Sequence, residues 1–368
     1  MVRIKRIVRF LLLAAIAGVA ALVVAIRYEA PCPAPSADAE GPDTMRAVVH
    51  ACYGSSEVLR LARIARPVPA DDEVLVRVHA AALNPLDVHE MTGKPYVMRL
   101  SSGFGRPEEI RAGVDFAGTV EAVGRAVTRW SVGQAVFGAR SGALADYVLV
   151  REQRLIAAKP PQLSFEEAAA LPIAATTALQ GLRDAGGLRA GQSVLINGAS
   201  GGVGSYAVQI AKALGAEVTG VCSTGNLALM RALGADHVID YTQNDFTERP
   251  ERYDLILDNV GNHSLRDTRN ALKPGGTLVL IGGPKRDPWL GPLGRSLQAV
   301  LSAPFVEANV TTMLAELKPD DLRTLAAMAG AGRLKPVIDR RYRLDEVAAA
   351  IDYVAQGHAR GKVIVTLE

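Results

Sequence analysis

The fold is decided by the stretch Gly191-Gln-Ser-Val-Leu-Ile-Asn-Gly-Ala-Ser-Gly-Gly-Val-Gly-Ser-Tyr-Ala-Val-Gln-Ile-Ala-Lys212. It predicts a buried strand over 194–197, a glycine turn over 198–204 and an amphipathic helix over 205–214. In such a unit the glycines let the backbone approach a pyrophosphate, while the N–H groups and the positive dipole at the helix start bind it. Ala199 takes the first glycine position of the Gly-x-Gly-x-x-Gly pattern, ahead of Gly201 and Gly204. The flanking strand and helix favour a dinucleotide site over a merely flexible loop.

The chain alternates strands and helices after this stretch. Strands are predicted at 194–197, 217–221, 237–240, 254–258 and 277–282, with helices in the gaps and a candidate sixth strand at 306–310. This order is typical of a doubly wound parallel α/β sheet.

Short β segments precede the stretch, from residue 45 to residue 150, and glycines punctuate them. That pattern predicts a small β-barrel-like domain. A helix should follow Ser164, which is a typical N-cap residue, and residues 319–367 should return to mixed helix and strand.

Composition excludes several classes of protein. The 368 residues can form two domains, and 49% hydrophobic with 21% charged residues indicates a globular chain. A net charge of +3 is too small to suggest a nucleic-acid partner. Cys32, Cys52 and Cys222 lie far apart without a CxxC pair, which predicts no disulfide framework and favours a reducing compartment.

The N-terminus carries an uncharged segment of seventeen residues, 10–26, between Arg9 and Arg27. At ~1.5 Å per residue it is at the short end of what crosses a ~30 Å hydrocarbon layer. We expect an N-terminal transmembrane helix that makes a single-pass membrane anchor, followed by a Pro/Ala-rich linker. A cleaved signal peptide and a translation start at Met45 are the alternatives.

The side of the membrane on which the body lies stays open. Basic residues before the segment place the N-terminus in the cytoplasm and the body on the far side. The cysteine pattern, and the cofactor inferred below, point the body toward the cytoplasm.

The stretch 191–212 matches the signature of the quinone oxidoreductase/zeta-crystallin family. Residues 45–368 resemble the zinc-independent branch of the medium-chain dehydrogenase/reductase superfamily along their whole length. Supporting motifs are Asn84-Pro-Leu-Asp87, Gly113-Val-Asp-Phe-Ala-Gly-Thr-Val-Glu-Ala-Val-Gly124, Leu171-Pro-Ile-Ala-Ala-Thr-Thr-Ala-Leu179 and Gly361-Lys-Val-Ile-Val365.

The resemblance implies a GroES-like β-barrel catalytic domain that is split around an inserted Rossmann domain. The expected boundaries are 1–44 for the anchor and linker, 45–173 and 304–368 for the catalytic domain, and 174–303 for the Rossmann domain. A homodimer is expected as well.

A zinc site is not expected. Zinc-dependent relatives carry a cysteine where this chain has Asn84, a Gly-His-Glu where it has Gly113-Val114-Asp115, and a four-cysteine lobe that it lacks. Zinc needs Cys, His or carboxylate ligands that converge on one point. Asp115 beside Val114 does not supply them.

The expected cofactor is NADPH. NAD-specific sites place an acidic residue about twenty positions after the turn, on the ribose 2′-OH. Val221-Cys-Ser-Thr-Gly-Asn226 holds no carboxylate there. The resemblance places Ser223, Asn226 and Tyr241 around a 2′-phosphate, with Lys362 or Arg360 reaching the cofactor, whereas Ser223 and Thr224 as ordinary turn residues are the alternative. The pyrophosphate cradle would consist of Ala199, Gly201, Gly202, Val203 and Gly204.

The nicotinamide end should be framed by Asn84, Thr177, Asn259 and Gly282. The resemblance makes Tyr96 a residue of the substrate cleft, although a packed aromatic at a domain edge fits it equally well. Asp87 is expected to orient the Asn84 loop.

These residues predict an NADPH-dependent reductase that transfers hydride to a quinone or an α,β-unsaturated carbonyl without zinc. Asn84, Tyr96 and water would donate hydrogen bonds to the oxygen that gains negative charge. The alternatives are a zinc-free alcohol dehydrogenase and a membrane-tethered NADPH-binding scaffold or sensor with little turnover.

Overall fold

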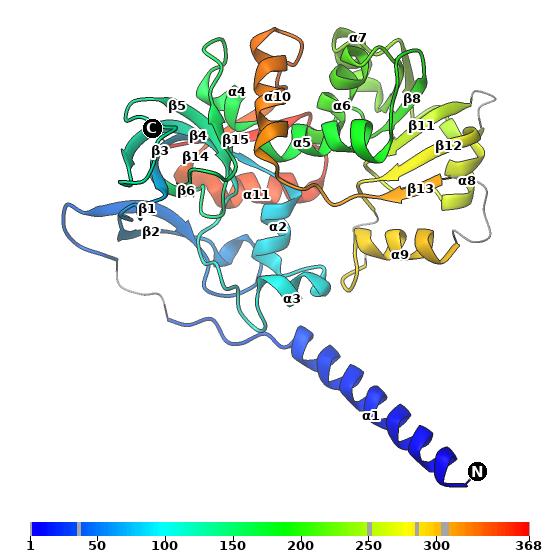
Figure 1. The fold of residues 1–368 in the computed structure, drawn as a ribbon, viewed down its shortest axis with the longest axis horizontal. Helices are drawn as coiled ribbons and strands as arrows, with labels where there is room; N and C mark the ends of the chain where they lie inside the picture. The colour runs from blue at the N-terminus through cyan, green and yellow to red at the C-terminus, as the bar shows by residue number, and fades with distance from the viewer. Residues whose placement is uncertain (1, 35–37, 249–251, 284–286, 303–308, 368) are drawn as a thin grey trace.

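The computed structural model describes residues 2–34, 38–248, 252–283, 287–302 and 309–367 (Figure 1). Six parallel strands form one sheet in the order β10-β9-β8-β11-β12-β13. They are β8 (Ser193–Asn197), β9 (Glu217–Cys222), β10 (His237–Asp240), β11 (Tyr253–Asp258), β12 (Leu272–Leu280) and β13 (Asn309–Thr312). The strand order reverses between β8 and β11, so the crevice at their carboxyl ends is the expected ligand site.

Helices connect these strands. They are α6 (Gly202–Ala213), α7 (Leu227–Ala232), α8 (Leu265–Asn270) and α9 (Pro292–Ser302). Helix α6 follows the glycine turn directly, as the strand–turn–helix pattern of the sequence predicts.

A second sheet has the order β14-β15-β3-β4-β5-β7, and β6 also pairs with β3. Its strands are β3 (Glu73–Leu83), β4 (Asp115–Val123), β5 (Ala135–Ala139), β6 (Tyr147–Arg151), β7 (Ile156–Ala158), β14 (Ile338–Arg343) and β15 (Lys362–Thr366). Because β15 lies between β14 and β3, the last residues of the chain complete a sheet that its first third begins. A parallel sheet inserted into a β-rich domain is therefore confirmed.

The remaining elements cover or flank the β-rich sheet. A separate hairpin pairs β1 (Thr44–Val49) with β2 (Arg60–Ala65). The helices are α2 (Pro85–Thr92), α3 (Arg99–Ser102), α4 (Phe165–Ala169), α5 (Pro172–Gln180), α10 (Pro319–Gly330) and α11 (Val347–Gln356). Ser164 caps α4 as predicted, because its hydroxyl accepts the Glu167 N–H at 3.1 Å.

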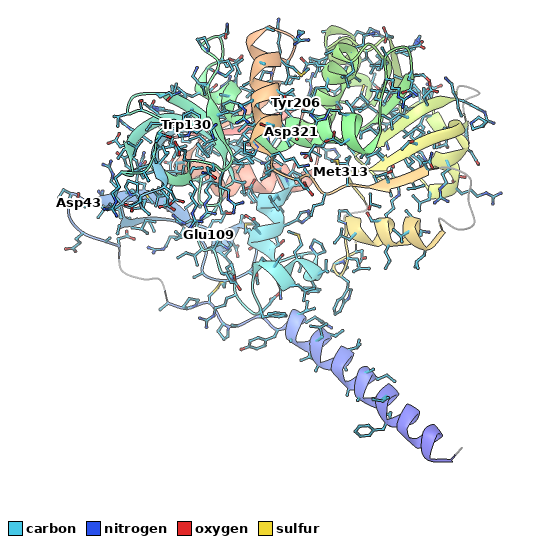
Figure 2. All side chains as sticks on the ribbon, in the orientation of Figure 1. Asp43, Glu109, Trp130, Tyr206, Met313 and Asp321 are labelled. Atoms are coloured by element: carbon cyan, nitrogen blue, oxygen red, sulfur yellow. A yellow bond between two sulfur atoms is a disulfide. The ribbon has the colours of Figure 1, made fainter. Side chains whose placement is uncertain are left out.

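Helix α5 joins the two parts of the molecule. It is buried along most of its length and packs against α6 and α10. Tyr206 of α6, labelled in Figure 2, donates from its hydroxyl to the Ala170 carbonyl just before α5. One continuous hydrophobic core therefore contains residues from both sheets, among them Phe137 and Ile196.

The transmembrane prediction is not confirmed. The apolar segment does form a helix, α1 (Val2–Arg27), which extends away from the body (Figure 1). Among the described residues, however, no helix has both the length and the apolar character that crossing a membrane requires. Single-pass anchoring is therefore not supported.

The cysteine prediction is wrong for one pair. Cys32 and Cys52 form a disulfide with their Cα atoms 5.1 Å apart. The pairing follows from the path of the chain after α1, where the Ala30 N–H donates to the Gly105 carbonyl at 3.0 Å and holds the segment against the body. Cysteine usage therefore does not indicate a reducing compartment for this chain.

The domain boundaries remain predictions. The proposed end of the Rossmann domain, at 303, lies outside the described residues, as do positions 306–308 of the candidate sixth strand and positions 35–37 of the linker. Strand β13 pairs with β12 just beyond that boundary, in the parallel sheet.

Candidate functional site

The glycine turn makes a close junction between β8 and α6. Gly198 has a φ of +75°, which favours glycine, and a Cβ on Gly204 would lie 2.2 Å from the Gly198 carbonyl oxygen. A Cβ on Gly201 would meet nothing closer than that oxygen at 3.5 Å. Gly204 is therefore required by packing, whereas Gly201 leaves the space over the turn open to a ligand.

Ala199 replaces a glycine without closing the turn. It is fully buried and its N–H donates to the Val221 carbonyl at 2.9 Å. Its methyl faces Gly220 of β9, where a Cβ would lie 3.2 Å away. Gly202 starts α6, and Val203 packs against the core.

The end of β9 holds a small polar cluster. The Asn226 amide donates to the hydroxyls of Ser200 and Ser223 at 3.2 and 3.1 Å. The Asn226 Oδ1 is buried and has no hydrogen-bond partner among the described residues. Tyr241 is exposed, and its N–H donates to the Cys222 carbonyl at 3.1 Å. Ser223, Asn226 and Tyr241 thus lie beside the end of β9, and their contact with a 2′-phosphate stays a prediction.

One carboxylate, Asp240, lies near this cluster and was not considered from the sequence. Its oxygens accept hydrogen bonds from Thr224 at 2.6 Å and from Thr242 at 2.8 Å. The Thr224 hydroxyl is the main reason that the pKa of Asp240 is lowered. The Asp240 carboxylate therefore accepts hydrogen bonds from neighbouring threonine hydroxyls, not from a ribose.

The loop after β11 is held by a buried ion pair. The Arg295 guanidinium of α9 contacts the Asp258 carboxylate, and both side chains are almost fully buried. Asp258 also accepts the Val260 and Gly261 N–H groups at 3.1 and 2.9 Å. This pair shapes the loop that carries Asn259.

Asn259, in that loop, lies against Gly282, which follows β12. The Asn259 amide donates to the Asn197 carbonyl at 2.9 Å, and its buried Oδ1 lacks a partner among the described residues. A Cβ on Gly282 would lie 2.0 Å from the Asn259 carbonyl oxygen. Glycine is thus the residue that allows these two strand ends to meet over the crevice.

Asn84 lies at the start of α2 in a buried polar network. Its side-chain nitrogen donates to Asp115 Oδ2 at 2.9 Å, and its oxygen accepts from the Lys362 ammonium. Lys362 also lies 3.4 Å from Asp115 Oδ2. Asp115 Oδ1 accepts the Ile173 N–H at 3.2 Å, at the start of α5. Thr177, one turn further along α5, donates to the Ile173 carbonyl at 2.7 Å.

Two carboxyl groups of α2, those of Asp87 and Glu90, lie next to this network. Asp87 accepts the Asn84 N–H at 2.6 Å, which gives it the orienting role expected for it. Burial, reinforced by the Glu90 carboxylate, raises the pKa of Asp87 to about 8. Burial, reinforced by Glu109, raises the pKa of Glu90 to about 7. Glu109, labelled in Figure 2, is bound by Arg111 at 2.9 Å.

Tyr96 lies in a separate aromatic cluster. Its ring contacts Trp289 edge-on at 5.2 Å, and the Arg99 guanidinium lies 4.8 Å from its centre. Arg99 is fully buried and binds Glu29 at 2.7 Å, so residues next to α1 help to hold this cluster. The structure therefore gives Tyr96 the contacts of a packed aromatic, and its role in the substrate cleft stays a prediction.

The structure thus brings together Asn84 with Lys362, Ser223 with Asn226, and Asn259 with Gly282. Sequence reasoning missed Ser200, Asp258 and Arg295, which hold these residues, and Asp240, which binds the neighbouring Thr224. An acidic residue at the end of a Rossmann strand was a usable signal for Asp240 and Asp258. No comparable sequence signal marks Arg295, which lies 37 positions after Asp258.

The crevice residues fit a dinucleotide. The open space over Gly201 and the unpartnered oxygens of Asn226 and Asn259 lie at the carboxyl ends of β8, β9 and β11, at and beside the point where the strand order reverses. At the positions of the zinc ligands the side chains are the Asn84 amide, Val114 and the Asp115 carboxylate, and the Lys362 ammonium lies beside them. Within the described ranges no three His, Cys, Asp or Glu side chains gather in a way that could bind a metal ion.

Two family models match the chain. Residues 70–161 match an alcohol dehydrogenase GroES-like domain, and residues 233–365 match a zinc-binding dehydrogenase model. A 2-methylene-furan-3-one reductase of Solanum lycopersicum is 35% identical over 339 residues, which cover 88% of this chain and 79% of that protein. An NADPH-dependent alkenal/one oxidoreductase of Arabidopsis thaliana is 34% identical, covering 90% and 81%. The solved structure of a quinone oxidoreductase from Coxiella burnetii has a TM-score of 0.76 and 29% identity, covering 88% and 100%.

Proposed function

The chain belongs to the zinc-independent medium-chain dehydrogenases/reductases of the quinone oxidoreductase type, and we propose that it is an NADPH-dependent reductase of quinones or α,β-unsaturated carbonyls. The observation that carries the proposal is the buried Asn84–Asp115–Lys362 network beside a dinucleotide crevice. It offers hydrogen-bond donors and a positive charge where zinc-dependent relatives have metal ligands. The names of the relatives support both the cofactor and the two acceptor classes.

The chain's own residues would hold NADPH along the crevice. The backbone N–H groups at the start of α6 face the pyrophosphate position, with Gly201 leaving room for it. Ser223, Asn226 and Tyr241 would surround the 2′-phosphate. Thr177, Asn259 and Gly282 would hold the nicotinamide ring against the ends of β11 and β12.

Bound NADPH supplies a hydride, which adds to an electron-poor carbon of the acceptor. The electron pair displaced from that carbon moves onto the acceptor's oxygen, which then gains a proton from solvent. Asn84, which is buried and held by hydrogen bonds, donates a hydrogen bond to that oxygen, so the donor needs little reorganisation. The remaining task of the protein is to position the two reactants.

The full chain, NADPH and a panel of quinones and enones test the proposal, with alcohols plus NADP⁺ in parallel. Reduction of quinones or enones supports it. Oxidation of alcohols alone would assign a zinc-free alcohol dehydrogenase instead. Tight NADPH binding by fluorescence titration, with turnover no faster than solution chemistry, would assign a binding scaffold or sensor. The homodimer, also a prediction, is tested by light scattering on the same preparation.

A further inference from the structure

We infer that Lys362 is a positioning residue that, together with Asp115, orients the side-chain amide of Asn84, and that it is not a ligand of the cofactor phosphates. The inference rests on the proposed function, in which Asn84 donates to the acceptor's oxygen.

The two bonds to the Asn84 amide allow one orientation. The oxygen accepts from the Lys362 ammonium, and the nitrogen donates to Asp115 at 2.9 Å. If the amide were flipped, its N–H groups would face an ammonium that can only donate, and its oxygen would face a carboxylate that can only accept. A charged donor and a charged acceptor therefore hold the amide more firmly than neutral partners would.

The second N–H of this amide has only a long hydrogen bond within the protein, which an acceptor's oxygen would replace. Its nearest protein acceptor, the Ala82 carbonyl oxygen, lies 3.5 Å from the nitrogen, which is too long for a strong hydrogen bond. The orientation that Lys362 and Asp115 impose thus directs one donor at Asp115 and leaves the other for the acceptor's oxygen.

Burial makes the charged pair effective. Lys362 is 3% exposed and Asp115 is fully buried. Burial raises the pKa of Asp115, while the ammonium and the hydrogen bonds from Asn84 and Ile173 oppose that rise. Each charge stabilises the other, so removing one of them leaves an uncompensated charge in the protein interior.

The backbone and the ammonium of Lys362 lie at different sites. The resemblance implies that this residue reaches the cofactor, and its backbone lies beside the phosphate turn. Gly361 donates its N–H to the Ser200 carbonyl at 2.9 Å, next to the glycine turn. The stem of Lys362 then passes the start of α6, where a Cβ on Gly202 would lie 3.3 Å from its Cδ. Its ammonium ends at Asn84 and Asp115. The backbone of residues 361–362 therefore touches the phosphate turn, whereas the charge lies at the catalytic amide.

The test compares Lys362→Met, the double variant Asp115→Asn/Lys362→Met, and Lys335→Met, a control at an exposed lysine. We expect Lys362→Met to lower kcat about 100-fold, in the range seen when one oxyanion donor is lost. The Kd for NADPH should stay within about twofold, because the cofactor contacts are unchanged. The double variant should regain thermal stability, since no unpaired buried charge remains, but should not regain kcat.

Three outcomes would overturn the inference. A rise of tenfold or more in the Kd for NADPH in Lys362→Met would make Lys362 a phosphate ligand. Recovery of kcat together with stability in the double variant would make the pair merely structural. A wild-type kcat in Lys362→Met would show that Lys362 has no role in positioning the Asn84 amide. If the wild-type chain reduces no acceptor, the proposed function fails separately, and the Kd comparison still decides whether Lys362 binds phosphate.

Discussion

Two glycines of the turn, Gly201 and Gly204, should respond differently to the same substitution. In Gly204→Ala the new methyl would lie 2.2 Å from the Gly198 carbonyl oxygen, so strand and helix must move apart by about 1 Å to relieve the contact. We expect a loss of about 1–3 kcal/mol in the free energy of unfolding. In Gly201→Ala the nearest protein atom is 3.5 Å away, so the fold should lose only the small preference of glycine over alanine at an N-cap.

Gly201→Ala should weaken the binding of NADPH. The methyl at 201 occupies the space over the turn where the backbone meets the pyrophosphate, and we expect at least a tenfold higher Kd for NADPH, about 1.4 kcal/mol. Fluorescence titration measures the Kd, and thermal unfolding without cofactor measures stability. Wild-type NADPH affinity in Gly201→Ala would refute the assignment of this turn to the pyrophosphate. Unchanged stability in Gly204→Ala would refute the packing argument.

Three more substitutions test other parts of the account. Ser223→Asp places a carboxylate at the expected 2′-phosphate, so it should raise the Kd for NADPH far more than that for NADH; equal changes would count against this position. Because burial raises the pKa of Glu90 from 4.5 to about 7, the folded chain binds this proton more tightly than the unfolded chain, and stability should fall as pH rises through that window. Urea unfolding at about pH 5 and pH 8 measures this fall in the free energy of unfolding. Glu90→Gln should show a smaller fall than the wild-type chain, whereas the exposed control Glu57→Gln should match the wild type. Equal falls in the wild type and Glu90→Gln would contradict the role of Glu90. Arg99→Met removes the guanidinium that packs on Tyr96, so a raised KM for the acceptor at unchanged NADPH affinity is expected, and an unchanged KM would place Tyr96 outside the substrate cleft.

The sequence predicted the parts of the fold that depend on local order. Glycines at the turn, an N-cap at Ser164 and the alternation of strands and helices are each encoded within a few residues, and the structure has all of them. The contact between Asn226 and Ser223 could be predicted for the same reason, because the two residues lie three positions apart.

Long-range partners could not be predicted in this way. Lys362 and Asn84 are 278 positions apart, and Arg295 and Asp258 are 37 apart, so no local period links them. The disulfide depends on how the segment after α1 folds back on the body, which the spacing of Cys32 and Cys52 does not reveal. Where the Lys362 ammonium ends was beyond prediction too, because a position beside the phosphate turn says nothing about where a long side chain ends.

The most direct test of a metal-free hydride transfer is isotope tracing. Full-length protein treated with a chelator would be given NADPH that carries deuterium at the transferring position of its nicotinamide, together with an enone, and the product would be examined by NMR. The account predicts that deuterium appears on the carbon β to the carbonyl, at a rate that zinc does not change. NADPH oxidation without deuterium in the product, or turnover that chelation abolishes and zinc restores, would contradict it.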